Sequence, residues 1–108
     1  MKIRFDILFP NGTSDAFEGA TGTGWPGSSK DSLVKIMEFP SRPMLGETLN
    51  FYDKLAPCNA FKVTDVMHGI NEEKNAIELV VCAESEENEE PEGLVTCARS
   101  YIEHGWGE

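Results

Sequence analysis

The side chains with the greatest capacity for chemistry in this sequence are its three cysteines and two histidines. Cys58 is the most interesting thiol because it lies in a Pro-Cys-Asn segment, with Lys54 and Lys62 as the nearest cations that could favour a thiolate. A nucleophilic Cys58 needs a base such as His68, and together with Tyr52 these residues could form the site of a small enzyme or ligand-binding barrel. The alternative is an ordinary thiol and an imidazole at a strand end.

The cysteines and histidines do not have the spacing of a metal site. No two of them stand in the C-x-x-C or H-x-x-x-H arrangements that bring ligands together locally, so we expect no metal. Three is also an odd number in a chain long enough to fold on its own core, which argues against a disulfide framework. We therefore expect reduced thiols, with Cys82 and Cys97 as small buried residues.

A glycine motif could indicate a nucleotide cofactor. Gly22, Gly24 and Gly27 spell G-x-G-x-x-G, the spacing that lets a backbone approach a dinucleotide pyrophosphate. However, Pro26 lies inside the motif, no clear strand leads straight into it, and the chain is too short for a doubly wound sheet. We therefore expect a flexible glycine loop and no cofactor.

Three residues are candidates for contact with a protein partner. Trp25 and Trp106 both lie next to glycines, where a large ring either covers an edge of the core or serves as an aromatic anchor at an interface. Arg42 lies in a segment with a proline on each side and is a similar exposed candidate. The alternative for Arg42 is an ordinary surface arginine.

The charge of the chain restricts the class of partner. Nine Lys and Arg residues stand against 19 Asp and Glu, which gives a net charge of -10. This balance opposes direct binding to nucleic acid and docking on an anionic membrane, since both depend on cationic side chains. Six glutamates lie in residues 84–92. They are most simply solvated charge, and the alternative is an acidic surface that mimics nucleic acid and inhibits a basic protein.

Targeting segments are not evident in the sequence. The longest apolar stretch, residues 76–83, is interrupted by Glu78 and is much shorter than a bilayer span. The first residues alternate apolar with charged side chains, unlike a signal peptide. We therefore expect a cytoplasmic protein.

The first third of the chain predicts one strand and one long loop. Residues 1–9 have the period-2 alternation of a half-buried strand, closed by a Pro-Asn-Gly turn. Residues 10–32 are rich in Gly, Ser, Thr and Asp and predict a loop, with at most a short strand near residues 16–18. Loops of this length are often functional, so residues 10–32 are the first place to look for a site.

Residues 33–83 predict antiparallel strands. Residues 33–39 fit either a strand or a helix, and the Pro- and Gly-rich connection 40–47 that follows favours the strand. A short strand is expected at residues 48–52.

The second part of this region predicts a hairpin. In residues 60–68 the apolar alternation slips by one residue near Thr64 and Asp65, which predicts a β-bulge. Residues 69–75 are polar and form the expected turn, and residues 76–83 return as the second strand.

The C-terminal part predicts an acidic linker over residues 84–91 and a helix over residues 92–104. Pro91 suits the first helical position, and Gly105 suits the C-terminal cap. An isolated helix of this length is marginal, so its apolar stripe should dock on the sheet or on a partner.

Together these elements predict one small domain over residues 1–108, with a mainly β (α+β) fold: a small antiparallel β-barrel or strongly curved sheet with one C-terminal helix. The pattern resembles that of many small bacterial and phage barrels, a general resemblance that assigns no residue a role. We expect a non-enzymatic protein-interaction module that binds through the loop 10–32, the connection 40–47 or the helix. The alternatives are the acidic mimic and the ligand-binding barrel, and an edge strand could also pair two copies of the chain.

Overall fold

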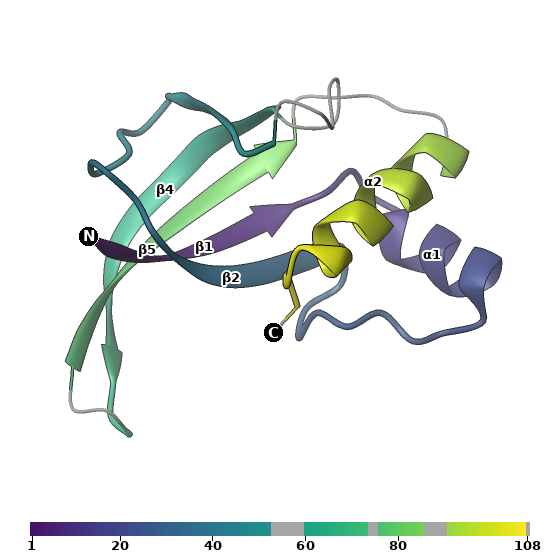
Figure 1. The fold of residues 1–108 in the computed structure, drawn as a ribbon, viewed down its shortest axis with the longest axis horizontal. Coiled ribbons are helices and arrows are strands. Elements are labelled where there is room, and N and C mark those ends of the chain that lie inside the picture. The colour runs from purple at the N-terminus through teal and green to yellow at the C-terminus, as the bar shows by residue number, and fades with distance from the viewer. Residues whose placement is uncertain (53–59, 74–75, 86–90, 108) are drawn as a thin grey trace.

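The computed structural model describes residues 1–52, 60–73, 76–85 and 91–107. Its elements in chain order are β1 (Lys2–Leu8), α1 (Thr13–Thr21), β2 (Ser32–Glu38), β3 (Thr48–Asn50), β4 (Ala60–Asn71), β5 (Ala76–Ser85) and α2 (Pro91–Glu103). The strands form one curled sheet in the order β2-β1-β5-β4-β3, and both helices lie at one end of it (Figure 1). This confirms the predicted mainly β fold with a strongly curved sheet and a C-terminal helix.

The pairing of β1 differs in part from the prediction. β1 is antiparallel to β2 but parallel to β5, whereas antiparallel strands were expected throughout. Hydrophobic alternation identifies a strand without showing which strand will be its neighbour, and β1 and β5 lie far apart in the chain. The strand interpretation of residues 33–39 is confirmed by β2.

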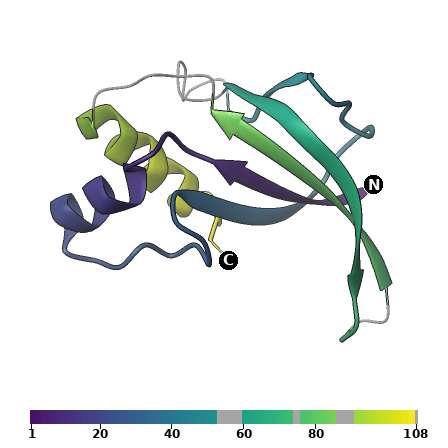
Figure 2. The same cartoon turned by 180° about the vertical axis from the view of Figure 1, so that it is seen from behind.

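β4 and β5 form the predicted hairpin, and the predicted bulge is present. The register of the pair shifts by one residue between Val63 and Asp65. β1 pairs with β5 only from Leu79 to Glu84, so the end of the hairpin extends beyond the rest of the sheet as a two-stranded arm (Figure 2).

Helix α1 is a correction, because its residues fall within the predicted loop 10–32. Asp31, which lies 17 residues after Ser14 in the sequence, caps the N-terminus of α1. Its carboxylate accepts hydrogen bonds from the backbone N–H groups of Gly12 and Ser14 and from the Ser14 hydroxyl, at 3.3, 2.7 and 2.8 Å. The residue at the N-cap position is Gly12, which has no side chain to cap the helix, so the cap comes from Asp31 instead.

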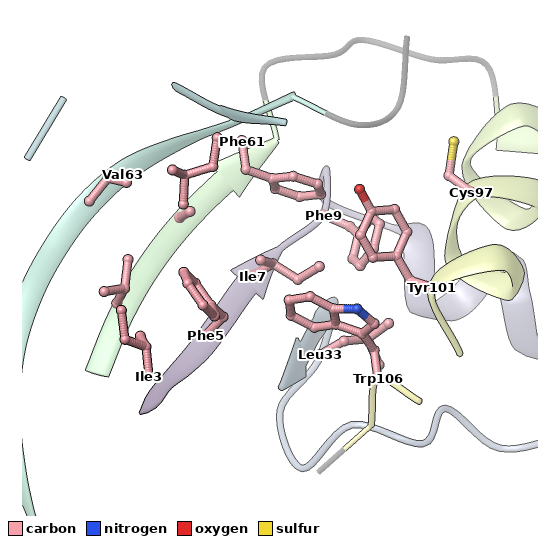
Figure 3. Close-up of a cluster of buried hydrophobic side chains, with 13 residues drawn as sticks. Ile3, Phe5, Ile7, Phe9, Leu33, Phe61, Val63, Cys97, Tyr101 and Trp106 are labelled. Atoms are coloured by element: carbon pink, nitrogen blue, oxygen red, sulfur yellow. The ribbon is translucent and has the colours of Figure 1, made fainter. Parts of the chain in front are cut away.

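The main hydrophobic core lies on the concave face of the sheet (Figure 3). Its buried residues come from alternate positions of the strands, from α2 and from the segments that flank them: Ile3, Phe5, Ile7, Phe9, Leu33, Leu49, Phe61, Val63, Val81, Ala83, Cys97, Tyr101 and Trp106. A smaller cluster of Phe17, Val95 and Ala98 joins α1 to α2. The two helices therefore close one end of the curved sheet.

Helix α2 ends at Glu103 and is capped by Gly105, the glycine that the sequence predicted as its cap. Gly105 has a φ of 93° and donates its N–H to the carbonyl of Ile102 at 3.0 Å. Trp106 donates its N–H to the carbonyl of Tyr101 at 3.1 Å. These are the two hydrogen bonds of a Schellman motif, which turns the chain back toward the sheet. The turn brings Trp106 into the core.

The cysteines differ from expectation at one position. Cys97 is disulfide-bonded, whereas reduced thiols were expected, and Cys82 is a free thiol. An odd number of cysteines does not exclude one bridge, and the spacing of cysteines along a chain does not show which of them meet in space. Cys58 lies outside the described residues.

Candidate interaction surface

A tight turn at residues 44–47, in the predicted connection 40–47, is held firmly against the sheet. Glu47 donates its N–H to the carbonyl of Met44 at 3.0 Å, and Gly46 at the third position has a φ of 85°. This is the geometry of a type II turn, in which the third position favours glycine. Gly46 and Glu47 also form backbone hydrogen bonds with Val63 of β4, at 2.9 and 2.8 Å. The turn is therefore fixed at both its central and its final residue.

This turn presents two large apolar side chains to solvent. Met44 and Leu45 are 71% and 70% exposed, the largest values among the exposed apolar residues of the described chain. The residue before them, Pro43, is fully buried and anchors the segment. A rigid turn that holds neighbouring apolar side chains in water loses little entropy when a partner covers them.

The turn borders a depression beside β4. The residues that line it are Arg42, Pro43, Met44, Leu45, Asp65 and Val66, around a volume of about 410 Å³. We refer to these residues as the β4-edge surface. The depression combines apolar walls with one cation and one carboxylate.

The strand beside this depression has an unpaired edge. β4 has 12 residues, but β3 pairs only with Ala60, Phe61 and Lys62. The hydrogen bonds of Val63 to the turn end the pairing on that side. Beyond Val63, the described part of the chain places no further strand on this edge of β4. Free backbone donors and acceptors on such an edge can pair with another strand.

Of the three candidate residues for protein contact, the structure places Arg42 alone on this surface. Trp106 is 2% exposed and belongs to the core, where its indole N–H donates to the Tyr52 hydroxyl at 3.0 Å. Trp25 is half-buried, and its indole N–H donates to the carbonyl of Ser32 at 3.0 Å. Trp106 therefore belongs to the core, which was the alternative to the anchor role, whereas an anchor role for the half-buried Trp25 stays a prediction.

Of the candidate ligand or thiol residues, the structure describes Tyr52 and His68, and it does not bring these two together. The Tyr52 ring lies against His104 at 4.2 Å between ring centroids, next to α2. His68 is exposed where the hairpin arm begins, opposite Leu79 of β5, and it lies seven residues along β4 from Phe61, which corresponds to about 23 Å. Cys58 is not among the described residues.

The outer face of the sheet carries charges of both signs. Lys2 lies opposite Glu38 of β2, and Lys62 lies opposite Glu84 of β5. Most of the glutamate run, residues 86–90, lies outside the described residues.

The glycine motif has a structural use at one position. A Cβ atom added at Gly27 would lie 1.9 Å from the carbonyl oxygen of Ser32, so the backbone here packs too closely for any side chain.

Among the described residues, no cluster of His, Cys, Asp and Glu could hold a metal ion. No helix of the described ranges is long and apolar enough to cross a membrane.

Comparisons with known proteins found no matching family model, no similar curated protein and no similar solved structure.

Proposed function

We propose that this chain is a non-enzymatic protein-interaction module and that it binds its partner through the β4-edge surface. The observation that carries the proposal is the exposure of Met44 and Leu45 on a turn that is hydrogen-bonded to β4. A monomeric domain gains nothing in stability from two large apolar side chains in water, whereas a partner that covers them gains the free energy of their burial.

The composition of the surface also supports binding to a protein. Arg42 at its border can pair with a carboxylate, and arginine is enriched at interfaces. Apolar side chains surrounded by charged residues match the common arrangement of an apolar centre and a polar rim. The net charge of -10 favours partners with a basic surface for the initial encounter.

The test is a capture experiment that compares three forms of the immobilised chain in extracts of the native host. The double substitution Met44→Ser and Leu45→Ser should abolish capture of the partner and leave the free energy of unfolding within about 0.5 kcal/mol of the wild type, since both residues are exposed. Ile36→Ser is the matched control, because Ile36 is 44% exposed on β2, outside the β4-edge surface, and should retain capture. Equal capture by all three forms would contradict the proposal.

A further inference from the structure

The edge-facing backbone groups of β4 follow from its register with β5. The N–H and C=O groups of Val63 point to the free edge, because they bond to the turn at residues 44–47. Edge-facing positions of an antiparallel strand recur at every second residue of the neighbouring strand, and Val66 and His68 occupy the next two. In the described part of the chain, no backbone group bonds to Val66 or His68 from this side. These two residues therefore offer donors and acceptors to a partner.

The free edge is regular and begins at the depression. β4 continues for eight residues beyond Val63, about 27 Å of strand, and its pairing with β5 is regular from Asp65 to Asn71. No proline occurs in this part of the sequence. The depression lined by residues 42–45, Asp65 and Val66 lies at the first free position. A row of edge groups is satisfied by an extended chain, and the end of such a chain reaches the apolar walls of the depression.

The charges along this edge favour a basic partner. Exposed carboxylates lie in the turn, beside the depression and just after the end of β4: Glu47, Asp65, Glu72 and Glu73. The described cations at the edge are Arg42, which lines the depression, and Lys62, which lies opposite Glu84 of β5. The whole chain has a net charge of -10. Lysine and arginine side chains of a partner are therefore attracted to this edge, and acidic side chains are repelled.

We infer that the partner contributes an extended, basic segment that pairs with β4 beyond the turn as an additional strand. This inference rests on the proposed function, because it states what the same surface binds. Val66 and His68 each form backbone hydrogen bonds with the segment. The residues opposite Asp65 and Met67 lie on one face of the sheet. A Lys or Arg opposite Asp65 forms an ion pair, and an apolar residue opposite Met67, which is 42% exposed, covers it.

Selection from a displayed library of random peptides on the immobilised full chain tests the inference. We expect the enriched peptides to combine Lys or Arg with apolar residues and to lack proline, because proline removes a backbone donor from a strand. Synthetic copies of these peptides then serve as the probe in binding titrations, and circular dichroism confirms that each variant of the chain is folded.

Two proline substitutions test the backbone pairing. His68→Pro removes an edge-facing donor of β4 and should weaken peptide binding by about tenfold. Ile36→Pro is the matched control on the opposite edge of the sheet. Its N–H faces outward because Val34, two residues earlier, bonds to Gly107 on that side. Ile36→Pro should bind the peptides like the wild type, and both variants should stay folded, since a free edge tolerates proline.

Two charge reversals test the basic character of the segment and leave the backbone intact. Asp65→Lys should weaken peptide binding severalfold at low salt. Asp15→Lys changes the net charge by the same amount on α1, where the Asp15 side chain is 70% exposed, and should have little effect.

Several results would overturn the inference: a failure to enrich peptides, enriched peptides without Lys or Arg, equal binding by the two proline variants, or equal binding by the two charge reversals. The double substitution Met44→Ser and Leu45→Ser decides the proposed function separately. If it abolishes peptide binding and His68→Pro does not, the β4-edge surface is the binding site but its partner does not add a strand. If His68→Pro abolishes binding and the double substitution does not, the proposed role of the turn is wrong.

Discussion

The carboxylate of Asp31 accepts a hydrogen bond from the backbone N–H of Ser14 at 2.7 Å, across 17 residues of chain. This contact ties the N-terminus of α1 to the residue that immediately precedes β2. Asp31 is buried and has a φ of 62°, a left-handed conformation that aspartate tolerates better than most residues. The local sequence before α1 offers no cap of its own, so the helix depends on this distant side chain.

Removal of the Asp31 carboxylate should destabilise the protein. We expect Asp31→Ala to lower the free energy of unfolding by about 1–2 kcal/mol, because the cap is lost and alanine is strained at this φ. Asp31→Asn keeps an acceptor oxygen and tolerates the backbone conformation, so it should lose less. Urea unfolding of the two variants measures the difference, and equal stabilities would contradict the capping role.

The two glycines on either side of Trp25 should differ in their response to the same substitution. Gly27→Ala places a Cβ 1.9 Å from the Ser32 carbonyl oxygen and should lower the free energy of unfolding by about 1–3 kcal/mol. Gly24→Ala meets no atom within 4 Å and should be neutral or slightly stabilising. Thermal unfolding of both variants tests this contrast, which disappears if residues 24–27 do not pack against β2.

The stability of the protein should decrease at alkaline pH because of Tyr101. Burial, with a smaller contribution from Tyr52, raises the pKa of Tyr101 well above its ordinary value. The unfolded chain releases the Tyr101 proton near pH 10, whereas the folded protein retains it to higher pH. The contribution of the buried phenol to the free energy of unfolding is therefore fully present below about pH 10 and decreases as the pH rises above it. In Tyr52→Phe, the only remaining phenol is Tyr101. Its ultraviolet titration should follow the loss of circular dichroism, and ionisation in the folded protein near pH 10 would contradict its burial.

The free thiol of Cys82 should react slowly. Burial, followed by the carboxylates of Asp6 and Asp65, raises the pKa of this thiol, and Arg4 opposes them. Asp65→Asn should therefore accelerate alkylation of Cys82 severalfold at neutral pH, and Arg4→Gln should slow it. Asp15→Asn, in the first turn of α1, is the control and should have no effect. Mass spectrometry of the alkylated chain measures the rates, and unchanged rates in all three variants would exclude this electrostatic control.

Much of the sheet could be predicted because its signals are local. The alternation in residues 1–9 identifies β1, and the slip near Thr64 places the bulge at the shift found between Val63 and Asp65. Gly105 caps α2 as predicted. What the sequence could not show depends on distant contacts: the parallel pairing of β1 with β5, the disulfide of Cys97, and α1, whose cap comes from Asp31.

The candidate site was predictable only in part. Arg42 and the connection 40–47 were identified from their prolines and glycine, because such residues indicate a shaped turn. The exposure of Met44 and Leu45 depends on two hydrogen bonds to Val63, which lies in another strand. The burial of Trp106 follows from the chain reversal after α2, and glycines on both sides of a tryptophan do not distinguish that outcome from an exposed anchor.

Photo-crosslinking in the native host tests the central claim most directly. A photoreactive amino acid at Leu45, which is 70% exposed, is compared with the same amino acid at Asp15, whose side chain is also 70% exposed but lies on α1. The account predicts a discrete protein adduct at position 45 that is absent at position 15. No adduct at position 45, or the same adducts at both positions, would contradict the assignment of the β4-edge surface as the site of interaction.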